Sequence, residues 1–284
     1  MRVVYLNGSF LPEEEALISP FDRGFLFADA VYEVTSVIEG RLIDFDGHWE
    51  RLQRSLGMLK MGVPMDRDTL LDMHRQLVSR NGIDEGLIYL QVTRGAADRD
   101  FAFPPEGTPQ TVFAMTQAKG LIDNPVAKKG MKIVTVDDLR WDLCDVKTVQ
   151  LLYPSLAKMA AKGRGADDAW LVRDGLVTEG TSNNTYIVTD DGEIVTRDLS
   201  HAILHGITRK AVLACAERLG YRLVERAFTP EEAEGAREAF ISSAGTFVLP
   251  VVSINGHTLG NGAPGPVAEA LRAEYIRVAR ETAI

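Results

Sequence analysis

The lysines of this chain do not all lie in similar surroundings. Of the nine, eight lie in polar stretches or on predicted helices beside other charges, whereas Lys147 follows the segment Leu143-Cys144-Asp145-Val146. We interpret that segment as the end of a mostly apolar strand that leads into a helix. Burial disfavours the charged ammonium form of a lysine, and Schiff-base chemistry requires a neutral amine. A lysine whose head group reaches water is the alternative from this local pattern alone.

Two segments of the second half carry polar groups that suit a closely approaching ligand. Glu179 lies among small hydroxyl and amide residues in residues 177–184, although an ordinary polar loop has the same composition. Further on, Leu204-His205-Gly206-Ile207-Thr208-Arg209 leads into a predicted helix. The free backbone N–H groups, a threonine hydroxyl and the positive end of the helix dipole predict an anion-binding site there. Simple helix capping is the alternative.

The first half contributes an aromatic residue and two arginines. Tyr32 lies in Asp29-Ala30-Val31-Tyr32-Glu33-Val34, a run rich in strand-forming residues. Arg51 flanks the apolar face of a predicted helix, with a salt bridge to Glu50 or a neighbour as the alternative. Arg99 lies in a loop of about ten residues that contains glycine and proline, and long ordered loops are often functional.

The composition excludes several classes of protein. The chain has 284 residues, of which 45% are hydrophobic and 25% charged, so it is not intrinsically disordered. A net charge of -9 argues against a dedicated nucleic-acid surface. Cys144 and Cys215 are too few for a disulfide scaffold and lack a zinc-ligand spacing, and no apolar run is long enough to cross a bilayer. Because the start has no signal-peptide core, we expect a cytoplasmic, two-lobed enzyme with no metal, nucleic-acid or membrane partner.

The apolar pattern predicts a mixed α/β (α+β) fold in two domains, because strands and helices follow one another without regular alternation. Predicted strands cover residues 3–6 with a hairpin turn at Asn7-Gly8, two antiparallel strands within 30–45 that break at Glu39-Gly40, and residues 87–93, 111–116, 132–136, 169–172, 185–189 and 239–242. Predicted helices cover residues 48–60, 68–80, 149–162, 208–219 and 267–280. The predicted domains are an N-terminal α/β domain at 1–118, a linker at 119–127 and a C-terminal domain at 128–284.

Five short motifs, taken in order, resemble the fold-type IV pyridoxal-phosphate enzymes. This family includes D-amino-acid aminotransferases, branched-chain aminotransferases and aminodeoxychorismate lyases. The motifs are Phe21-Asp22-Arg23-Gly24 followed by residues 29–34, then residues 48–52, Lys147 with its flanks, residues 177–184, and Gly206-Ile207-Thr208-Arg209. The resemblance covers nearly the whole chain. The D-amino-acid branch is the most similar, judged from Tyr32-Glu33-Val34, residues 94–104 and Cys144-Asp145-Val146-Lys147.

The resemblance implies roles at a pyridoxal 5'-phosphate cofactor bound to the C-terminal domain. Lys147 would form the Schiff base and then act as acid and base in the proton shift. Glu179 would keep the pyridine nitrogen protonated, so that the ring accepts electrons, and Leu204 would pack against the ring face. The phosphate would be held by Arg51 and by a set of residues from two turns: Gly206, Ile207, Thr208, and Gly245 with its neighbours Ala244 and Thr246.

The resemblance also implies how the substrate is held. Tyr32 and Arg99 match positions that bind the substrate α-carboxylate. In a homodimer, the partner subunit is one source of Arg99. Two positions differ from the family pattern. Phe101 stands where the D-amino-acid branch often has histidine, which weakens the expected carboxylate site and predicts a shift toward bulkier or less carboxylate-dependent amines. The turn at Ala244-Gly245 lacks the hydroxyls of many relatives, so phosphate contacts there would rely on backbone N–H groups.

The implied activity is a pyridoxal-phosphate-dependent transamination that moves the amino group of a D-amino acid, such as D-alanine, to a 2-oxo acid. A branched-chain or (R)-amine transaminase and an aminodeoxychorismate lyase are the alternatives on the same scaffold. Outside catalysis, the chain could be a cofactor-binding or purely structural protein. The retained pair of Lys147 and Glu179 argues against that alternative.

Overall fold

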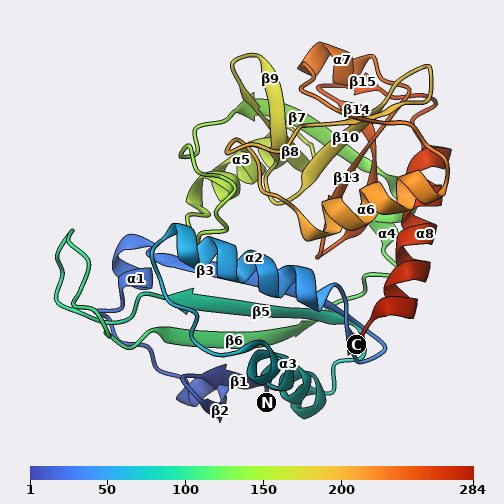
Figure 1. The fold of residues 1–284 in the computed structure, drawn as a ribbon. Helices are drawn as coiled ribbons and strands as arrows, with labels where there is room; N and C mark the ends of the chain where they lie inside the picture. Colours follow the sequence, from blue (N-terminus) through green and yellow to red (C-terminus); the bar gives the residue numbers. More distant parts are fainter. The chain divides into compact units, whose positions relative to one another are not determined.

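The computed structural model describes residues 1–284, which form two compact units. Unit 1 comprises Met1–Gly120, Val146–Gln150 and Thr282–Ile284, and unit 2 comprises Leu121–Asp145 and Leu151–Glu281. Each unit has its own β-sheet with helices beside it (Figure 1), which is the mixed α/β architecture that the sequence predicts. The segment with Lys147 belongs to unit 1, whereas the sequence-based boundaries include it in the C-terminal domain.

Unit 1 is built on a six-stranded sheet with the strand order β2-β1-β6-β5-β3-β4, in which neighbouring strands run antiparallel. Its elements are β1 (Val3–Leu6), β2 (Ser9–Pro12), the 3-10 helix η1 (Glu13–Glu15), α1 (Arg23–Phe27), β3 (Ala30–Ile38), β4 (Arg41–Leu42), α2 (Phe45–Met58), α3 (Arg67–Asn81), β5 (Gly86–Thr93) and β6 (Thr111–Ala118).

Both predicted hairpins of unit 1 are confirmed. Asn7 and Gly8 join β1 to β2 with φ angles of 47° and 96°, and Glu39 and Gly40 join β3 to β4 with 53° and 69°. A two-residue loop with positive φ at both positions matches the right-handed twist of the strands that it connects. Asparagine and glycine tolerate this backbone, which is why the sequence reveals the first turn directly.

Two helices lie along this sheet, α2 beside β3 and α3 beside β1 and β6 (Figure 1). α2 begins at Phe45, earlier than the predicted His48, because the buried Phe45 ring packs edge-on against His74 of α3 with ring centroids 5.4 Å apart. α3 begins where the side chain of Asp66 accepts a hydrogen bond from Thr69 N at 2.7 Å, and it ends before Gly82 in the left-handed region. These caps satisfy backbone groups that a helix end leaves unpaired.

Unit 2 is built on a nine-stranded mixed sheet with the order β12-β11-β10-β13-β14-β7-β8-β9, and β15 pairs with β14. Its elements are α4 (Pro125–Lys129), β7 (Met131–Asp137), α5 (Leu152–Gly163), β8 (Asp168–Arg173), β9 (Leu176–Gly180), β10 (Asn184–Val188), β11 (Ile194–Thr196), α6 (Ile207–Arg218), β12 (Leu223–Glu225), α7 (Pro230–Glu234), β13 (Glu238–Ser243), β14 (Phe247–Ile254), β15 (His257–Thr258) and α8 (Pro266–Thr282).

Five strands of this sheet lie outside the sequence prediction: β9, β11, β12, β14 and β15. Of these, β9 and β14 show why local patterns fail. Residues 177–184 are not one polar loop, because β9 runs through Glu179 and pairs with β8. The strand β14 lies outside the predicted set, and Pro250 within it removes a backbone donor, which argues against a central strand. In the structure Pro250 lies opposite Phe240 of β13, and apolar residues on both sides of it are buried. Burial of the whole strand outweighs the missing donor.

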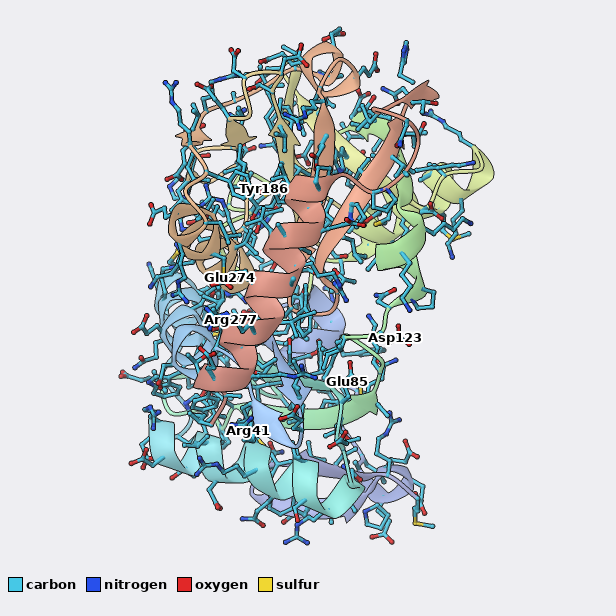
Figure 2. All side chains as sticks on the ribbon, turned by 90° about the vertical axis from the view of Figure 1, so that its right-hand side faces the viewer. Arg41, Glu85, Asp123, Tyr186, Glu274 and Arg277 are labelled. Carbon is cyan, nitrogen blue, oxygen red and sulfur yellow. The ribbon has the colours of Figure 1, made fainter.

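The last helix, α8, combines a packed side and an exposed charged side. Leu271 and Tyr275 are buried. Arg277 pairs with Glu274 at 2.7 Å and with Glu281 at 2.6 Å, and Figure 2 shows Glu274 and Arg277 side by side on this helix. Among all the helices, none is both long enough and apolar enough to span a membrane.

Candidate active site

Lys147 lies beside strand β3 of unit 1. Its carbonyl oxygen accepts a hydrogen bond from Tyr32 N at 2.9 Å, and Val149 N donates to Ala30 O at 3.2 Å. Thr148 adds a bridge to β3. These bonds explain why the segment belongs to unit 1, and they correct the sequence-based picture. Lys147 does not end a strand, and the next helix, α5, begins only at Leu152.

The amine of Lys147 lies against an aromatic ring. Nζ is 4.0 Å from the centroid of the Tyr32 ring, and it makes no hydrogen bond or ion pair within unit 1. The side chain is partly buried. A lysine that serves only as a surface charge normally keeps its head group in water or beside a carboxylate. The local arrangement therefore leaves this amine available for chemistry.

Tyr32 is itself held in place by a second aromatic ring. Tyr32 stacks on Tyr89 of β5, with centroids 5.5 Å apart and ring planes at 27°. The hydroxyl of Tyr89 donates to Gln91 Oε1 at 2.7 Å. Burial, with a smaller contribution from Tyr32, raises the pKa of Tyr89 to about 12, so this phenol stays neutral at physiological pH. The pair of rings forms a fixed wall beside Lys147.

Arg51 of α2 forms a buried ion pair with Glu33 of β3. Arg51 Nε and Nη2 donate to the two carboxylate oxygens of Glu33 at 2.8 and 2.7 Å, and His48 Nδ1 lies 2.7 Å from Glu33 Oε2. Burial alone would raise the pKa of Glu33, but the charge and hydrogen bonds of Arg51, with those of His48, outweigh it and lower the pKa to about 2. The partner of Arg51 is thus a strand residue rather than Glu50, and the bidentate geometry fixes its guanidinium.

Ser55 links helix α2 to the backbone of Lys147. Ser55 follows Arg51 by one turn of α2, and its hydroxyl oxygen accepts a hydrogen bond from Lys147 N at 3.4 Å. Tyr32 and Glu33 are neighbours on β3. The structure therefore brings three of the predicted residues, Lys147, Tyr32 and Arg51, to one junction of α2 and β3 in unit 1.

His74 lies next to this ion pair and predicts an acid-sensitive step in stability. Burial lowers the pKa of His74 to about 4, although its hydrogen bond to Leu70 O and the charge of Glu33 oppose the shift. The unfolded chain therefore binds a proton more readily than the folded chain does. We expect the free energy of unfolding to fall by about 3 kcal/mol as the pH drops from 6.5 to 4. Urea unfolding at a series of pH values measures this slope.

The matched variants for this test are His74→Phe and His257→Asn. His74→Phe removes the titrating group and should flatten the curve between pH 6.5 and 4. His257 lies on the surface beside Glu234, so His257→Asn controls for the loss of a histidine outside the core. A His74→Phe protein with the same slope as the parent chain would contradict the assignment. Glu33 contributes a separate loss of stability at lower pH. That loss falls between its usual pKa of 4.5 and its folded pKa of about 2, where the carboxylate becomes protonated.

Arg99 lies in the segment that connects β5 to β6, and this segment is fixed by two buried arginines. Arg23 Nε and Arg94 Nε both donate to Asp29 Oδ2, at 2.8 and 2.7 Å. Arg23 Nη1 also donates to Asp100 O at 2.7 Å. Arg99 itself is exposed, and no contact in unit 1 joins it to Lys147 or Tyr32. The structure thus presents Arg99 to solvent on an anchored loop.

Glu179 is the centre of a hydrogen-bond network in unit 2. Its side chain is buried on β9, and it accepts from Arg140 Nη1 at 2.5 Å and from Leu204 N at 3.1 Å. Asn184 Nδ2 donates to Glu179 Oε2 at 3.3 Å. Several donors on a buried carboxylate hold it in one orientation. Leu204, predicted to pack on a ring, therefore also orients Glu179 through its backbone.

Arg140 is a candidate site residue that the sequence alone does not reveal. Its guanidinium forms two hydrogen bonds with Asp138, at 2.9 and 2.8 Å, in addition to the bond to Glu179. Burial alone would lower the pKa of Arg140, but the hydrogen bonds with Asp138 and the charges of both carboxylates raise it above its usual value. Burial also raises the pKa of the nearby Cys144 to about 11, so this cysteine remains a thiol. No local pattern links Arg140 to a residue 39 positions away.

The N-terminus of α6 carries the predicted anion-binding residues. Gly206 is its N-cap, and no side chain caps the free N–H groups of the first turn. Thr208 is buried and Ile207 is partly buried. A Cβ on Gly206 would lie 2.1 Å from Asn184 Oδ1, so a larger residue there would displace the Asn184 side chain from its present contacts. Uncapped N–H groups at the positive end of a helix suit an anion.

Asn184 joins the parts of unit 2 around Glu179, and it is the last residue of the polar segment 177–184 that the sequence singles out. Besides its contact with Glu179, its Nδ2 donates to Leu204 O at 3.0 Å. Its backbone lies opposite Ser242 of β13, just before the turn that contains Gly245. The structure thus brings together the remaining predicted residues, which are Glu179, Leu204, Gly206, Ile207, Thr208 and Gly245.

The turn with Gly245 is supported from two sides. The hydroxyls of Ser243 and Thr246 are 2.8 Å apart and bond to each other. Arg272 of α8 donates to the carbonyl oxygens of Thr246 and Val248, both at 2.8 Å. These bonds occupy the hydroxyls and carbonyls of the turn, so an anion here would meet backbone N–H groups, as the sequence indicates.

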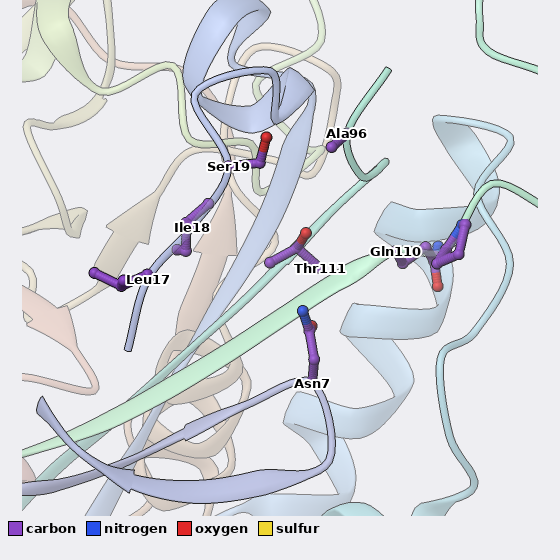
Figure 3. Close-up of a pocket in the computed structure, with 8 residues that line it drawn as sticks. Asn7, Leu17, Ile18, Ser19, Ala96, Gln110 and Thr111 are labelled. Atoms are coloured by element: carbon purple, nitrogen blue, oxygen red, sulfur yellow. The ribbon is translucent and has the colours of Figure 1, made fainter. Parts of the chain in front are cut away.

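A pocket of about 270 Å³ lies elsewhere in unit 1 (Figure 3). Its walls come from the segment after η1, the start of β6 and the loop before it, and they include none of the predicted site residues. Asn7, Leu17, Ser19, Gln110 and Thr111 are among the residues that line it.

Comparison with known proteins identifies similar chains over nearly the full length. The family model of amino-transferase class IV matches residues 30–254. The D-alanine aminotransferase of Bacillus licheniformis is 38% identical over 270 residues, which cover 95% of this chain and 94% of the relative. The D-alanine aminotransferase of Staphylococcus haemolyticus is 36% identical over 274 residues, which cover 96% of both chains.

Solved structures of aminotransferases also match this chain over nearly its full length. A branched-chain amino acid aminotransferase of T.th., complexed with N-(5'-phosphopyridoxyl)-L-glutamate, superposes with a TM-score of 0.91 and 28% identity. The match covers 99% of this chain and 94% of that one. The same protein with pyridoxamine 5'-phosphate also gives a TM-score of 0.91 and 28% identity, covering 98% of this chain and 94% of that one.

Proposed function

Because the chain belongs to the class IV aminotransferases, we propose that it transfers the amino group of a D-amino acid, such as D-alanine, to a 2-oxo acid. The observation that carries the reaction type is the amine of Lys147, which is partly buried against Tyr32 and lacks a polar partner in unit 1. The similarity to two D-alanine aminotransferases along almost the entire chain supports the substrate class.

We further propose that the cofactor is pyridoxal 5'-phosphate. The residues present fit its three functional parts. The aldehyde requires an amine, which Lys147 supplies, and the ring nitrogen requires a fixed carboxylate, which Glu179 supplies with Arg140 behind it. The phosphate requires donors, and the α6 N-terminus at Gly206 leaves uncapped N–H groups. Two solved structures of a relative hold pyridoxal-derived ligands, which supports the proposal.

Phosphate binding would use several residues. Ile207 and Thr208 would donate from the first turn of α6, and Gly245 from its turn. Arg51 would add a charged donor, because its bidentate pairing with Glu33 holds the guanidinium rigid. Leu204 would contact the ring face.

In the proposed chemistry, Lys147 transfers protons and Glu179 supplies a fixed negative charge. When bound, pyridoxal phosphate supplies a carbonyl that condenses with amines and a ring that withdraws electrons from the adjacent carbon. Lys147 Nζ would take the proton from the α-carbon of the substrate and deliver it to the carbon bonded to the other side of the transferred nitrogen. Glu179 Oε2 would hold a proton on the ring nitrogen by accepting its hydrogen bond, and Arg140 would keep that carboxylate ionised. Tyr32 and Arg99 would bind the α-carboxylate of the substrate.

The stereochemistry of the donor tests this proposal. We expect D-alanine, with 2-oxoglutarate as the acceptor, to be turned over at least about tenfold faster than L-alanine, since Lys147, as the one proposed acid–base group, would reach the α-proton from one side only. Half-reactions with each enantiomer, followed by absorbance, measure the ratio. Turnover of L-amino acids alone would overturn the D assignment.

The same panel tests the alternatives. The fold similarity to a branched-chain amino acid aminotransferase favours L-leucine and L-valine as the second donor class, and chiral amines test an (R)-amine transaminase. A lyase that cleaves aminodeoxychorismate would instead release pyruvate without any amino acceptor. We further infer a homodimer, since the proposed carboxylate site takes Arg99 from a second subunit. Light scattering measures the mass of the assembly. We propose the cytoplasm as the location of the protein.

A further inference from the structure

Two aromatic rings flank the side chain of Arg99. The guanidinium carbon lies 5.2 Å from the centroid of the Phe27 ring and 5.6 Å from that of Phe101. The two rings also meet each other edge-on, with centroids 5.7 Å apart at 66°. Both distances lie within the range in which a ring face attracts a guanidinium. The rings therefore act on Arg99 together rather than as separate contacts.

The backbone on both sides of Phe101 is fixed. Arg23 Nη1 donates to Asp100 O at 2.7 Å and to Ala102 O at 3.2 Å, and Asp29 holds Arg23 through Nε. The guanidinium of Arg23 also lies 4.5 Å from the Phe27 ring centroid. One buried arginine thus fixes the positions of both rings that contact Arg99.

Phe101 is 81% exposed, so burial in the apolar core does not explain its presence on this loop. A phenyl ring also offers no hydrogen-bond donor to a carboxylate. Its main contacts in unit 1 are with Arg99 and Phe27. A cation attracted to ring faces keeps its N–H edge free for a planar anion.

We propose that Phe101 is a positioning residue, which together with Phe27 holds the guanidinium of Arg99 in the orientation that binds the substrate carboxylate. The inference rests on the proposed function, because it takes Arg99 as the carboxylate ligand. It also revises the expectation from the sequence. Phe101 does not make substrate binding less dependent on the carboxylate group. Instead, it orients Arg99, the cation proposed to bind that group.

The test compares Phe101→Leu with Phe101→Tyr in the holoenzyme. Phe101→Leu keeps an apolar side chain but removes the ring face, so we expect the KM for D-alanine and the inhibition constant of propionate to rise about threefold, with kcat unchanged. Phe101→Tyr keeps the ring and should retain the parent values. Phe25→Leu is the matched control, because Phe25 is an exposed ring of the neighbouring helix α1 without a contact to Arg99.

Arg99→Ala separates failure of this inference from failure of the proposed function. If Arg99→Ala raises the KM for D-alanine while Phe101→Leu leaves both constants unchanged, the positioning role is wrong and the carboxylate role of Arg99 stands. If Arg99→Ala has no effect on either constant, the assignment of Arg99 is wrong, and the inference fails with it. A fall in kcat at unchanged KM for Phe101→Leu would also overturn the positioning role.

Discussion

Replacing Lys147 with alanine should lower the transamination rate by about 10³-fold or more, because the variant loses both the covalent amine and the acid–base group. The purified parent protein should be coloured by an absorption band that borohydride bleaches, and the variant should lack this covalent chemistry. The amine has no ion pair in unit 1 to replace, and Tyr32 would remain stacked on Tyr89. Single-turnover kinetics and the absorption spectrum measure the two effects separately.

The control for this variant is Lys162→Ala. Lys162 is an exposed lysine of α5, so its loss removes one positive charge and leaves the candidate site intact. It should retain the activity and the band of the parent chain. An unchanged band in Lys147→Ala would refute the assignment of the covalent residue. Circular dichroism of both variants shows whether either has lost its fold.

Replacing Glu179 with glutamine should lower kcat by about 10²-fold to 10³-fold. Glutamine has nearly the same shape, so the bonds from Leu204 and Asn184 can persist, but the negative charge is lost. Without that charge, a protonated ring nitrogen is no longer stabilised, and Arg140 keeps only Asp138 as a charged partner. The loss should appear in kcat rather than in the KM of the amino acid, because Glu179 is assigned to the cofactor.

Two further variants make this test specific. Glu217→Gln removes an exposed carboxylate of α6 and should leave kcat unchanged. Glu179→Asp keeps the charge and should recover part of the lost rate, with the shorter side chain accounting for the rest. The absorption maximum of the bound cofactor gives a readout independent of turnover, since it responds to protonation of the ring nitrogen. A Glu179→Gln enzyme with parental kcat would contradict the role of this carboxylate.

Most of the structural elements follow from signals that lie within a few residues of one another. The turns at Asn7-Gly8 and Glu39-Gly40 form where the backbone needs positive φ, and the helices α2 and α3 follow the spacing of their leucines. The strands β9 and β14 do not follow from such signals. Their burial on a mixed sheet depends on neighbouring strands, and Pro250 is a local signal that points the other way.

The candidate site shows the same limit. Lys147, Glu179 and the helix start at Gly206 stand out by residue type and context, and their roles come from the family resemblance. The partners that orient them have no such signal. Arg140 lies 39 positions from Glu179, and it contacts that carboxylate only because the segment after β7 folds against β9.

Local patterns in the amino-acid sequence were thus sufficient for most of the elements, for the residues that can do chemistry and, through the motifs, for the family. Three pairings depend instead on the tertiary fold: the Lys147 segment with β3, Glu33 with Arg51, and Phe27 with Arg99. Local patterns do not predict these pairings, because propensities act over a few residues, whereas most of these contacts form between distant segments. A carboxylate, a guanidinium or a ring acquires its partner only when its own strand, helix or loop has been fixed by burial elsewhere.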